Sequence, residues 1–178
     1  FGKRAGEHAC QWAREHGEAR IDEGAVDRAI HEALVPFDRP EGENPYKVQS
    51  DLQETMQSLV GIVRNEGEMQ EAYARIQDLK ARAARVAGTG HREFHAGWHT
   101  SLDLRNLLAV SDCITRSAIE RKESRGGHFR EDYPDKVAEF GTVNVMTRLG
   151  ADGAPQVSRV PIPPMPDYLK AVIEEQKS

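Results

Sequence analysis

Three long amphipathic segments most constrain what this chain can fold into. In the first, from about Tyr46 to Arg64, apolar residues recur every three or four positions, at Val48, Leu52, Met56, Leu59 and Val63. The second, from about Glu68 to Val86, repeats this spacing at Met69, Tyr73, Ile76, Leu79 and Ala83. Such a period places the apolar side chains on one face of an α-helix. Both segments are therefore predicted to be helices with one buried face.

The third segment extends from about Glu93 to Glu123. The residues near its apolar face are Leu104, Leu108, Cys113 and Ile119, and two that widen it are Leu107 and Ile114. Only the short breaks NEG and AGTGH separate the three segments. Long amphipathic helices joined by short connections pack as antiparallel neighbours. We predict a mainly α fold, an antiparallel three-helix bundle of the spectrin-repeat type over residues 21–125.

Two further helices are predicted before this bundle. The segment FGKRAGEHACQWAREHG places Ala5, Ala9 and Ala13 on one stripe and ends at Gly17. A second helix begins after Asp22, a good N-cap, and extends to about Val35. The first helix starts without a capping residue or a signal peptide. We therefore expect the chain to be cut from a longer polypeptide.

After Pro134 the pattern changes from helix to strand. GTVNVMTRL alternates and is rich in β-branched residues, GADGAPQ has the composition of a turn, and VSRVPI follows. This order predicts a β-hairpin. PIPPMP reads as an extended spacer, and residues 167–178 as a closing helix capped by Asp167. Residues 126–178 therefore form a loop, hairpin and Pro-rich tail.

The composition excludes some function classes. The chain has 178 residues, 38% hydrophobic and 30% charged, with a net charge of −5, so it lacks the basic field of a nucleic-acid-binding protein. Its sequence contains no apolar run of about 18 residues that would span a membrane. Cys10 and Cys113 lie far apart and form no CxxC pair, which indicates reduced thiols.

Three histidines at intervals of four could place their imidazoles on one metal ion. They are His91, His95 and His99. No carboxylate follows at a matching spacing, and nearby glycines weaken a helix there. We therefore expect a solvated helix start, with Phe94 and Trp98 packed inward, and no metal site; a histidine-cluster metal site is the alternative.

The most unusual stretch is ESRGGHFREDYP at residues 123–134, the signature segment. It interleaves the potential cations Arg125, His128 and Arg130 with the carboxylates Glu123, Glu131 and Asp132 around two glycines, one of which can adopt the left-handed conformation. We expect a self-neutralising network that pins this loop to a neighbouring domain. Direct participation in a substrate site and docking of a partner protein are the alternatives.

The signature segment resembles the ESRG(A/G)H-x-R-x-D-(F/Y)-P motif of the flavoprotein subunits of succinate dehydrogenases and fumarate reductases. FGKRAGEHA is similar to the helix that ends the FAD-binding domain of that family, and residues 44–82 resemble the first long helices of its C-terminal domain. LDLRNLLAVSDCITRSAIERKESRGGH resembles the last helix running into the motif. The resemblance covers most of the chain.

This resemblance implies an oxidoreductase that interconverts succinate and fumarate on a bound FAD and passes electrons to an iron–sulfur subunit. The FAD site and the catalytic residues of the family lie before Phe1, so we expect no catalytic, cofactor-binding or metal-binding residue in this chain. Residues 1–20 would be the tail helix of the FAD-binding domain. The implied location is cytoplasmic, at the inner face of the cell membrane, through partner subunits that include a membrane anchor.

The expected role of the signature segment is to dock the bundle onto the FAD-binding domain, facing the iron–sulfur subunit. The residues assigned to it are Glu123, Ser124, Arg125, Gly126, Gly127, His128, Arg130 and Asp132, with Arg125 and His128 as the expected contacts. L-aspartate oxidase shares a similar motif, but that family usually ends soon after it, whereas this chain continues for 44 residues beyond Pro134. A stand-alone helical interaction module or metal binder is the remaining alternative.

Overall fold

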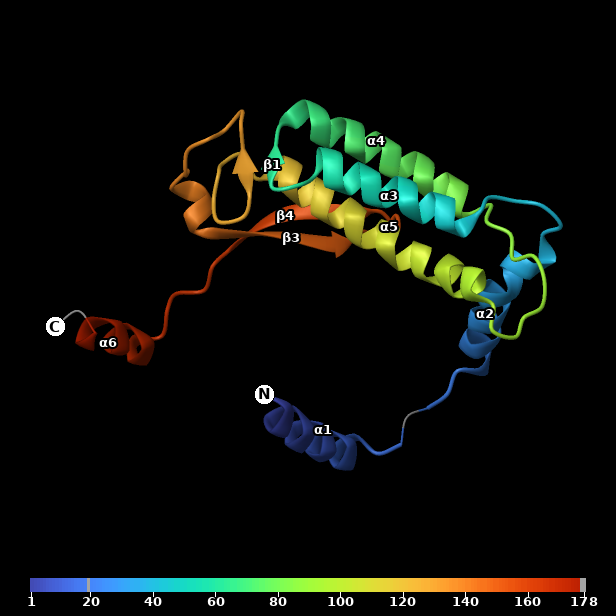
Figure 1. Cartoon of the computed structure of the whole chain (residues 1–178). Helices are drawn as coiled ribbons and strands as arrows, with labels where there is room; N and C mark the ends of the chain where they lie inside the picture. The colour runs from blue at the N-terminus through green and yellow to red at the C-terminus, as the bar shows by residue number, and fades with distance from the viewer. Residues whose placement is uncertain (19, 177–178) are drawn as a thin grey trace.

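The bundle consists of three long helices lying side by side in an up-down-up arrangement (Figure 1). The computed structural model describes residues 1–18 and 20–176. The three helices are α3 (Pro45–Leu59), α4 (Glu66–Ala83) and α5 (Ala96–Glu120). Asn44 and Asn65 cap α3 and α4 by accepting a backbone N–H in the next turn. The predicted mainly α fold with a three-helix bundle is confirmed.

The core of the bundle lies where the predicted apolar stripes meet. Val48 and Leu52 of α3 pack with Ile76 and Leu79 of α4, and α5 adds Leu104 and Leu108. Leu107 and Ile114 do not widen this face, because their side chains are exposed. The buried positions of α5 continue instead through polar residues, which are Ser111, Asp112 and Thr115.

The first bundle helix ends earlier than its stripe predicts. Helix α3 stops at Leu59, and Val63 is half exposed instead of buried. Val63–Arg64 form strand β1, which pairs in parallel with β2 (Phe129–Arg130) in the signature segment. Val63 continues the spacing of four by coincidence, so periodicity alone could not distinguish a helical turn from this two-residue strand.

Helix α5 is shorter than predicted at both ends. It begins at Ala96 with His95 as its N-cap and ends at Glu120, so Glu123 lies in the loop that follows. Phe94 does not pack inward: it has a positive φ of 51° and is fully exposed. Trp98 is partly buried, as expected, and donates its indole N–H to the carbonyl of Ala33 at 2.7 Å.

The N-terminal helices α1 (Gly2–His16) and α2 (Glu23–Leu34) have no buried residue. Gly17 ends α1 at a φ of 70°, and Asp22 caps α2 through the backbone N–H of Ala25, both as predicted. A short 3-10 turn, η1 (Val35–Asp38), connects α2 toward the bundle. Figure 1 shows α1 standing apart from α3–α5.

The predicted hairpin is present beyond the signature segment. After the turn η2 (Glu139–Gly141), strand β3 (Val143–Leu149) pairs antiparallel with β4 (Pro155–Pro161). Ser117 of α5 bonds to Thr147 of β3 at 2.9 Å, which attaches the hairpin to the bundle. Helix α6 (Asp167–Glu175) follows, with Pro166 as its N-cap, so Asp167 is not the cap that we predicted. Residues 177 and 178 of the predicted closing helix lie outside the described residues.

Candidate functional site: the signature segment

A buried carboxylate begins the signature segment. Glu123 is fully buried and accepts hydrogen bonds from the guanidinium groups of Arg121 and Arg125 and from the backbone N–H of Val137. The bonds from Arg125 measure 2.8 and 3.0 Å and form a bidentate pair. The bond from Arg125 is the main reason why the pKa of Glu123 falls to about 2, despite burial. Glu123 thus holds the end of α5 to the segment before the hairpin.

The chain then reverses in a tight turn over two glycines. The backbone groups of Arg125 and His128 bond to each other in both directions, at 2.8 and 3.1 Å. Gly126 has the predicted left-handed conformation, with a φ of 60°. Ser124 closes the loop from inside, because its hydroxyl accepts the backbone N–H of Arg130 and donates to the carbonyl of Tyr133. The glycines and the serine of the motif therefore shape the backbone.

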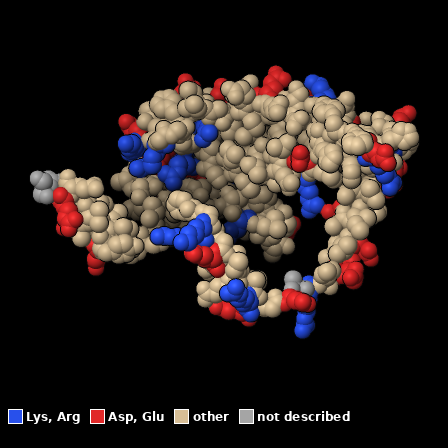
Figure 2. Space-filling model, turned by 60° about the horizontal axis from the view of Figure 1, so that its bottom comes forward, with Lys and Arg blue, Asp and Glu red and all other residues tan. Residues whose placement is uncertain are grey.

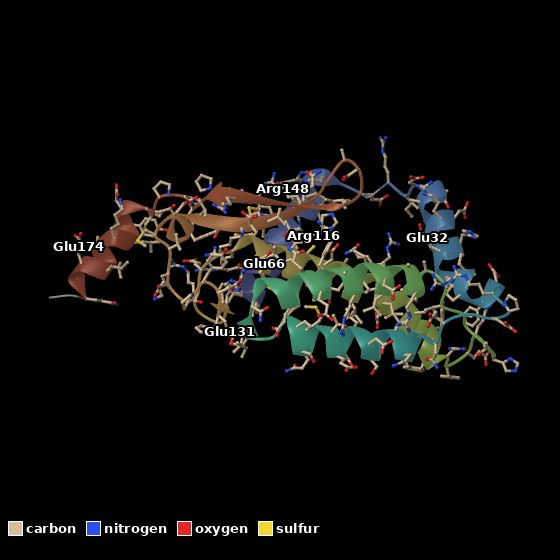
Figure 3. All side chains as sticks on the ribbon, turned by 90° about the horizontal axis from the view of Figure 1, so that it is seen from above. Glu32, Glu66, Arg116, Glu131, Arg148 and Glu174 are labelled. Atoms are coloured by element: carbon tan, nitrogen blue, oxygen red, sulfur yellow. The ribbon has the colours of Figure 1, made fainter. Side chains whose placement is uncertain are left out.

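Arg130 is the centre of the network and is fully buried. Its guanidinium forms a bidentate pair with Asp132 at 2.7 Å and bonds to Glu66 at the start of α4 at 2.8 Å. It also donates to the carbonyl of Ala118 near the end of α5. A cation at the C-terminal end of one helix and a carboxylate at the N-terminal end of the next both match the helix dipoles. Figure 3 shows Glu66 at that end of α4.

Asp132 links the same residues through the backbone. It accepts the backbone N–H of Glu66 at 3.0 Å, and its pairing with Arg130 is the main reason why its pKa falls to about 2. Arg130 also lies over the ring of Tyr133, 4.9 Å from the ring centre. The signature segment therefore clamps the end of α5 to the start of α4.

His128 is held between two groups that define its protonation state. One ring nitrogen, Nδ1, lies 2.8 Å from the guanidinium of Arg64, which can only donate. The other, Nε2, lies 2.9 Å from the carbonyl of Arg121, which can only accept. The arrangement requires a neutral imidazole protonated at Nε2. Burial lowers the pKa of His128, and the charges of Arg64, Arg130 and Arg121 lower it further, against the bond to the Arg121 carbonyl.

All eight residues assigned to the signature segment come together in one place. Sequence reasoning missed the three residues outside it that complete the network, namely Arg64, Glu66 and Arg121. Glu66 could have been suspected, because an acidic residue in the first turn of a helix is placed to interact with a cation there. Two of the three carboxylates of the signature segment, Glu123 and Asp132, are bound by arginines, whereas Glu131 is exposed and makes no ion pair with any residue that the structure describes. The binding of Glu123 and Asp132 favours a structural lock over acid–base chemistry.

A second polar cluster was also missed. Asp112 is fully buried on α5 and is bound by Lys80 of α4 and by Arg116, whose other nitrogen donates to the hydroxyl of Tyr73. Burial alone would raise the pKa of Asp112, but Lys80 and Arg116 lower it overall. Figure 3 shows Arg116 between the helices and the hairpin. The cluster fixes α4 against α5.

The three histidines at intervals of four do not form a site. His95 caps α5, where Nδ1 accepts the backbone N–H of Trp98 and Nε2 bonds to the carbonyl of Thr89, so both ring nitrogens are used. His91 precedes the helix, and His99 lies on it. Within residues 1–18 and 20–176, no group of three or more His, Cys, Asp or Glu side chains is arranged to hold a metal ion.

Comparison with known proteins identifies the family. The family model described as "Fumarate reductase flavoprotein C-term" matches residues 49–169. A chain of the Mycobacterium smegmatis Sdh1 complex in the apo form superposes with a TM-score of 0.83 and 42% identity, covering 94% of this chain and 29% of that one. The fumarate reductase flavoprotein subunit of Mycobacterium tuberculosis is 29% identical over 91% of this chain and 29% of that protein.

L-aspartate oxidases are related but match a smaller part. The enzyme of Vibrio cholerae is 37% identical over 94 residues, which is 51% of this chain and 16% of that protein. In all three comparisons the chain spans less than a third of the length of its relative. The chain therefore belongs to the succinate dehydrogenase and fumarate reductase flavoprotein family and corresponds to its C-terminal domain.

Proposed function

We propose that this chain is the non-catalytic C-terminal part of a FAD-dependent subunit that interconverts succinate and fumarate. FAD would bind to the remaining part of that subunit, and electrons would leave through an iron–sulfur subunit. The observation that supports a structural role best is the signature network, whose carboxylates are bound by arginines of this same chain. Such residues hold a shape and are not available to take up a proton.

The three parts of the chain would then have distinct roles. Residues 1–20 would end the FAD-binding domain, residues 21–125 would form the helical domain, and residues 126–178 would supply the signature loop and hairpin. The exposure of Trp12 in α1, a helix with no buried residue, supports a neighbour for this helix outside the described chain.

The same assignment has consequences for partners and location. The Sdh1 neighbour is a complex, which supports partner subunits for this protein as well. None of the helices that the structure describes is both long and apolar enough to cross a membrane. We propose a cytoplasmic protein held at the inner face of the membrane by an iron–sulfur subunit and a membrane anchor.

The proposal is tested with the longer polypeptide that the gene is expected to encode. Purified in that form, it should bind FAD, seen by its visible absorbance, and should reduce an artificial electron acceptor when succinate is added. The 178-residue chain, purified in parallel, should do neither. A longer polypeptide without flavin, or a 178-residue chain that oxidises succinate, would contradict the proposal.

Arg125 and His128 are the residues proposed to serve the contact with the FAD-binding domain, Arg125 directly and His128 through Arg64. Arg125 is partly exposed although it is paired with Glu123, so one side of its guanidinium remains open. Both ring nitrogens of His128 are used within the chain, so its contribution would be to position Arg64. We expect Arg125→Ala to weaken FAD retention in the longer polypeptide more than it destabilises the 178-residue chain. A docking role would be contradicted if Arg125→Ala affected the 178-residue chain as strongly as the longer polypeptide.

A further inference from the structure

One arginine beside the signature segment differs from its neighbours. The guanidinium groups of Arg121, Arg125 and Arg130 each bind a carboxylate. Among the described residues, the guanidinium of Arg64 bonds only to the carbonyl of Gly61 and to the ring of His128. Among the residues that the structure describes, no carboxylate lies within ion-pair distance of Arg64. The network of four guanidinium groups contains three carboxylates, so it has one unmatched positive charge.

The surroundings of Arg64 are unfavourable to this charge. Burial and the neighbouring guanidinium of Arg130 lower the pKa of Arg64, which means that the folded chain disfavours its charged form. His128, fixed as a neutral acceptor, offers no compensating negative charge. A guanidinium stays charged under all ordinary conditions, so an anion placed beside Arg64 would relieve this unmatched charge.

Space for such an anion exists next to Arg64. A hollow of about 460 Å³ is lined by the basic and polar residues Arg64, Arg121, His128, Ser117 and Asn144, together with Cys113, Ile114, Ala118 and Val145. No Asp or Glu is among the described residues that line it. Figure 2 shows Lys and Arg side chains gathered at the end of the bundle where the signature segment lies.

Apolar side chains flank the hollow. Leu107, Val110 and Ile114 are exposed on α5 at intervals of three and four, so they form one stripe that leads to the hollow. Val63 and Phe129, which pair in the β1–β2 ladder next to Arg64 and His128 in the chain, are also exposed. An exposed apolar stripe around a cationic centre is typical of a surface that another folded part of a protein covers.

We propose that the hollow beside Arg64 receives an Asp or Glu side chain from the part of the flavoprotein subunit that lies outside this chain. The inference rests on the proposed function, which supplies that part. Charge complementarity supports this occupant, and so does length: relatives are more than three times as long as this chain, so most of such a subunit lies outside it. Arg64 would then be a positioning residue that orients the bundle on the FAD-binding domain.

The test compares the same substitution in two contexts. In the 178-residue chain, Arg64→Gln loses two hydrogen bonds but also removes an unpaired, partly buried charge, so we expect little change in the unfolding midpoint. In the longer polypeptide the same substitution leaves the incoming carboxylate without a partner, which is costly. There we expect a clearly lower unfolding midpoint and weaker FAD retention, with Arg64→Lys restoring part of both.

Arg148→Gln is the matched control, because Arg148 is exposed on β3 of the hairpin, on the side away from α3 and α4 (Figure 3). This substitution should change neither the unfolding midpoint of the 178-residue chain nor the unfolding midpoint and FAD retention of the longer polypeptide. Equal destabilisation by Arg64→Gln in both contexts would overturn the inference, as would the lack of any longer polypeptide. A longer polypeptide that binds no FAD would overturn the proposed function instead, while the difference between the two contexts could still be measured.

Discussion

The two adjacent glycines of the signature segment differ in how much an added side chain would destabilise the folded chain. Gly126 has a φ of 60°, a conformation that costs other L-residues about 1–2 kcal/mol. Gly127 is not in that conformation, and a Cβ added to it would meet no atom within 4 Å. This difference agrees with the family motif, which accepts alanine only at the second position.

We therefore predict opposite results for two alanine substitutions. Gly126→Ala should lower the free energy of unfolding of the 178-residue chain by about 1–2 kcal/mol. Gly127→Ala, its control, should leave the free energy of unfolding unchanged or raise it by up to about 1 kcal/mol, because alanine has fewer conformations than glycine in the unfolded chain. Urea unfolding followed by circular dichroism measures both. A larger loss for Gly127→Ala than for Gly126→Ala would contradict the turn geometry.

His128 makes the stability of the chain depend on pH. Its pKa in the folded chain lies below the value of about 6.5 that an unfolded histidine has. The unfolded chain therefore binds more protons at mildly acidic pH, and the stabilisation from neutral His128 falls as the pH drops through about 6.5. This loss of stability levels off at a pH below the pKa of His128 in the folded chain.

The stability difference between the wild-type chain and His128→Gln should shrink as the pH falls from 8 to 5. Nitrogen-15 NMR of the imidazole should show a proton on Nε2 at neutral pH. A difference that stays constant, or that grows on acidification, would exclude the neutral clamp between Arg64 and Arg121.

Among the elements, the bundle helices and the hairpin could be predicted because each has a local period. The stripe through Leu52 or Ile76 and the alternation in residues 142–149 require no knowledge of the rest of the fold. The early end of α3 could not be predicted in this way, because Val63 and Arg64 pair with residues 66 positions further along the chain. The position of Arg64 beside His128 follows from that pairing. Only part of the site could therefore be predicted from the sequence.

The packing of the bundle helices can be tested at one core residue and one residue of α6. Ile76 is fully buried between the bundle helices, so Ile76→Ala should cost about 2–5 kcal/mol of unfolding free energy. Ile173 of α6 is 43% exposed, and Ile173→Ala should change stability by less than about 0.5 kcal/mol. Chemical denaturation of both variants measures this contrast. Equal losses would mean that α6 packs as tightly as the bundle does.

In the whole molecule, the bundle and hairpin form one packed unit, while the two terminal helices stand apart (Figure 1). Helices α1 and α6 have no buried residue, yet both expose large apolar side chains such as Trp12 and Tyr168. Together with the stripe on α5 and the unpaired charge of Arg64, these exposed apolar surfaces support the proposal that another part of a larger subunit covers this domain.

The most direct test of this account is to read the gene upstream of the codon for Phe1. We predict a long open reading frame that encodes a FAD-binding domain, recognisable by a strand, a GxGxxG loop and a helix in that order. A start codon within a few residues of Phe1 would contradict the account, because it would leave a helical bundle with no flavin domain to dock onto.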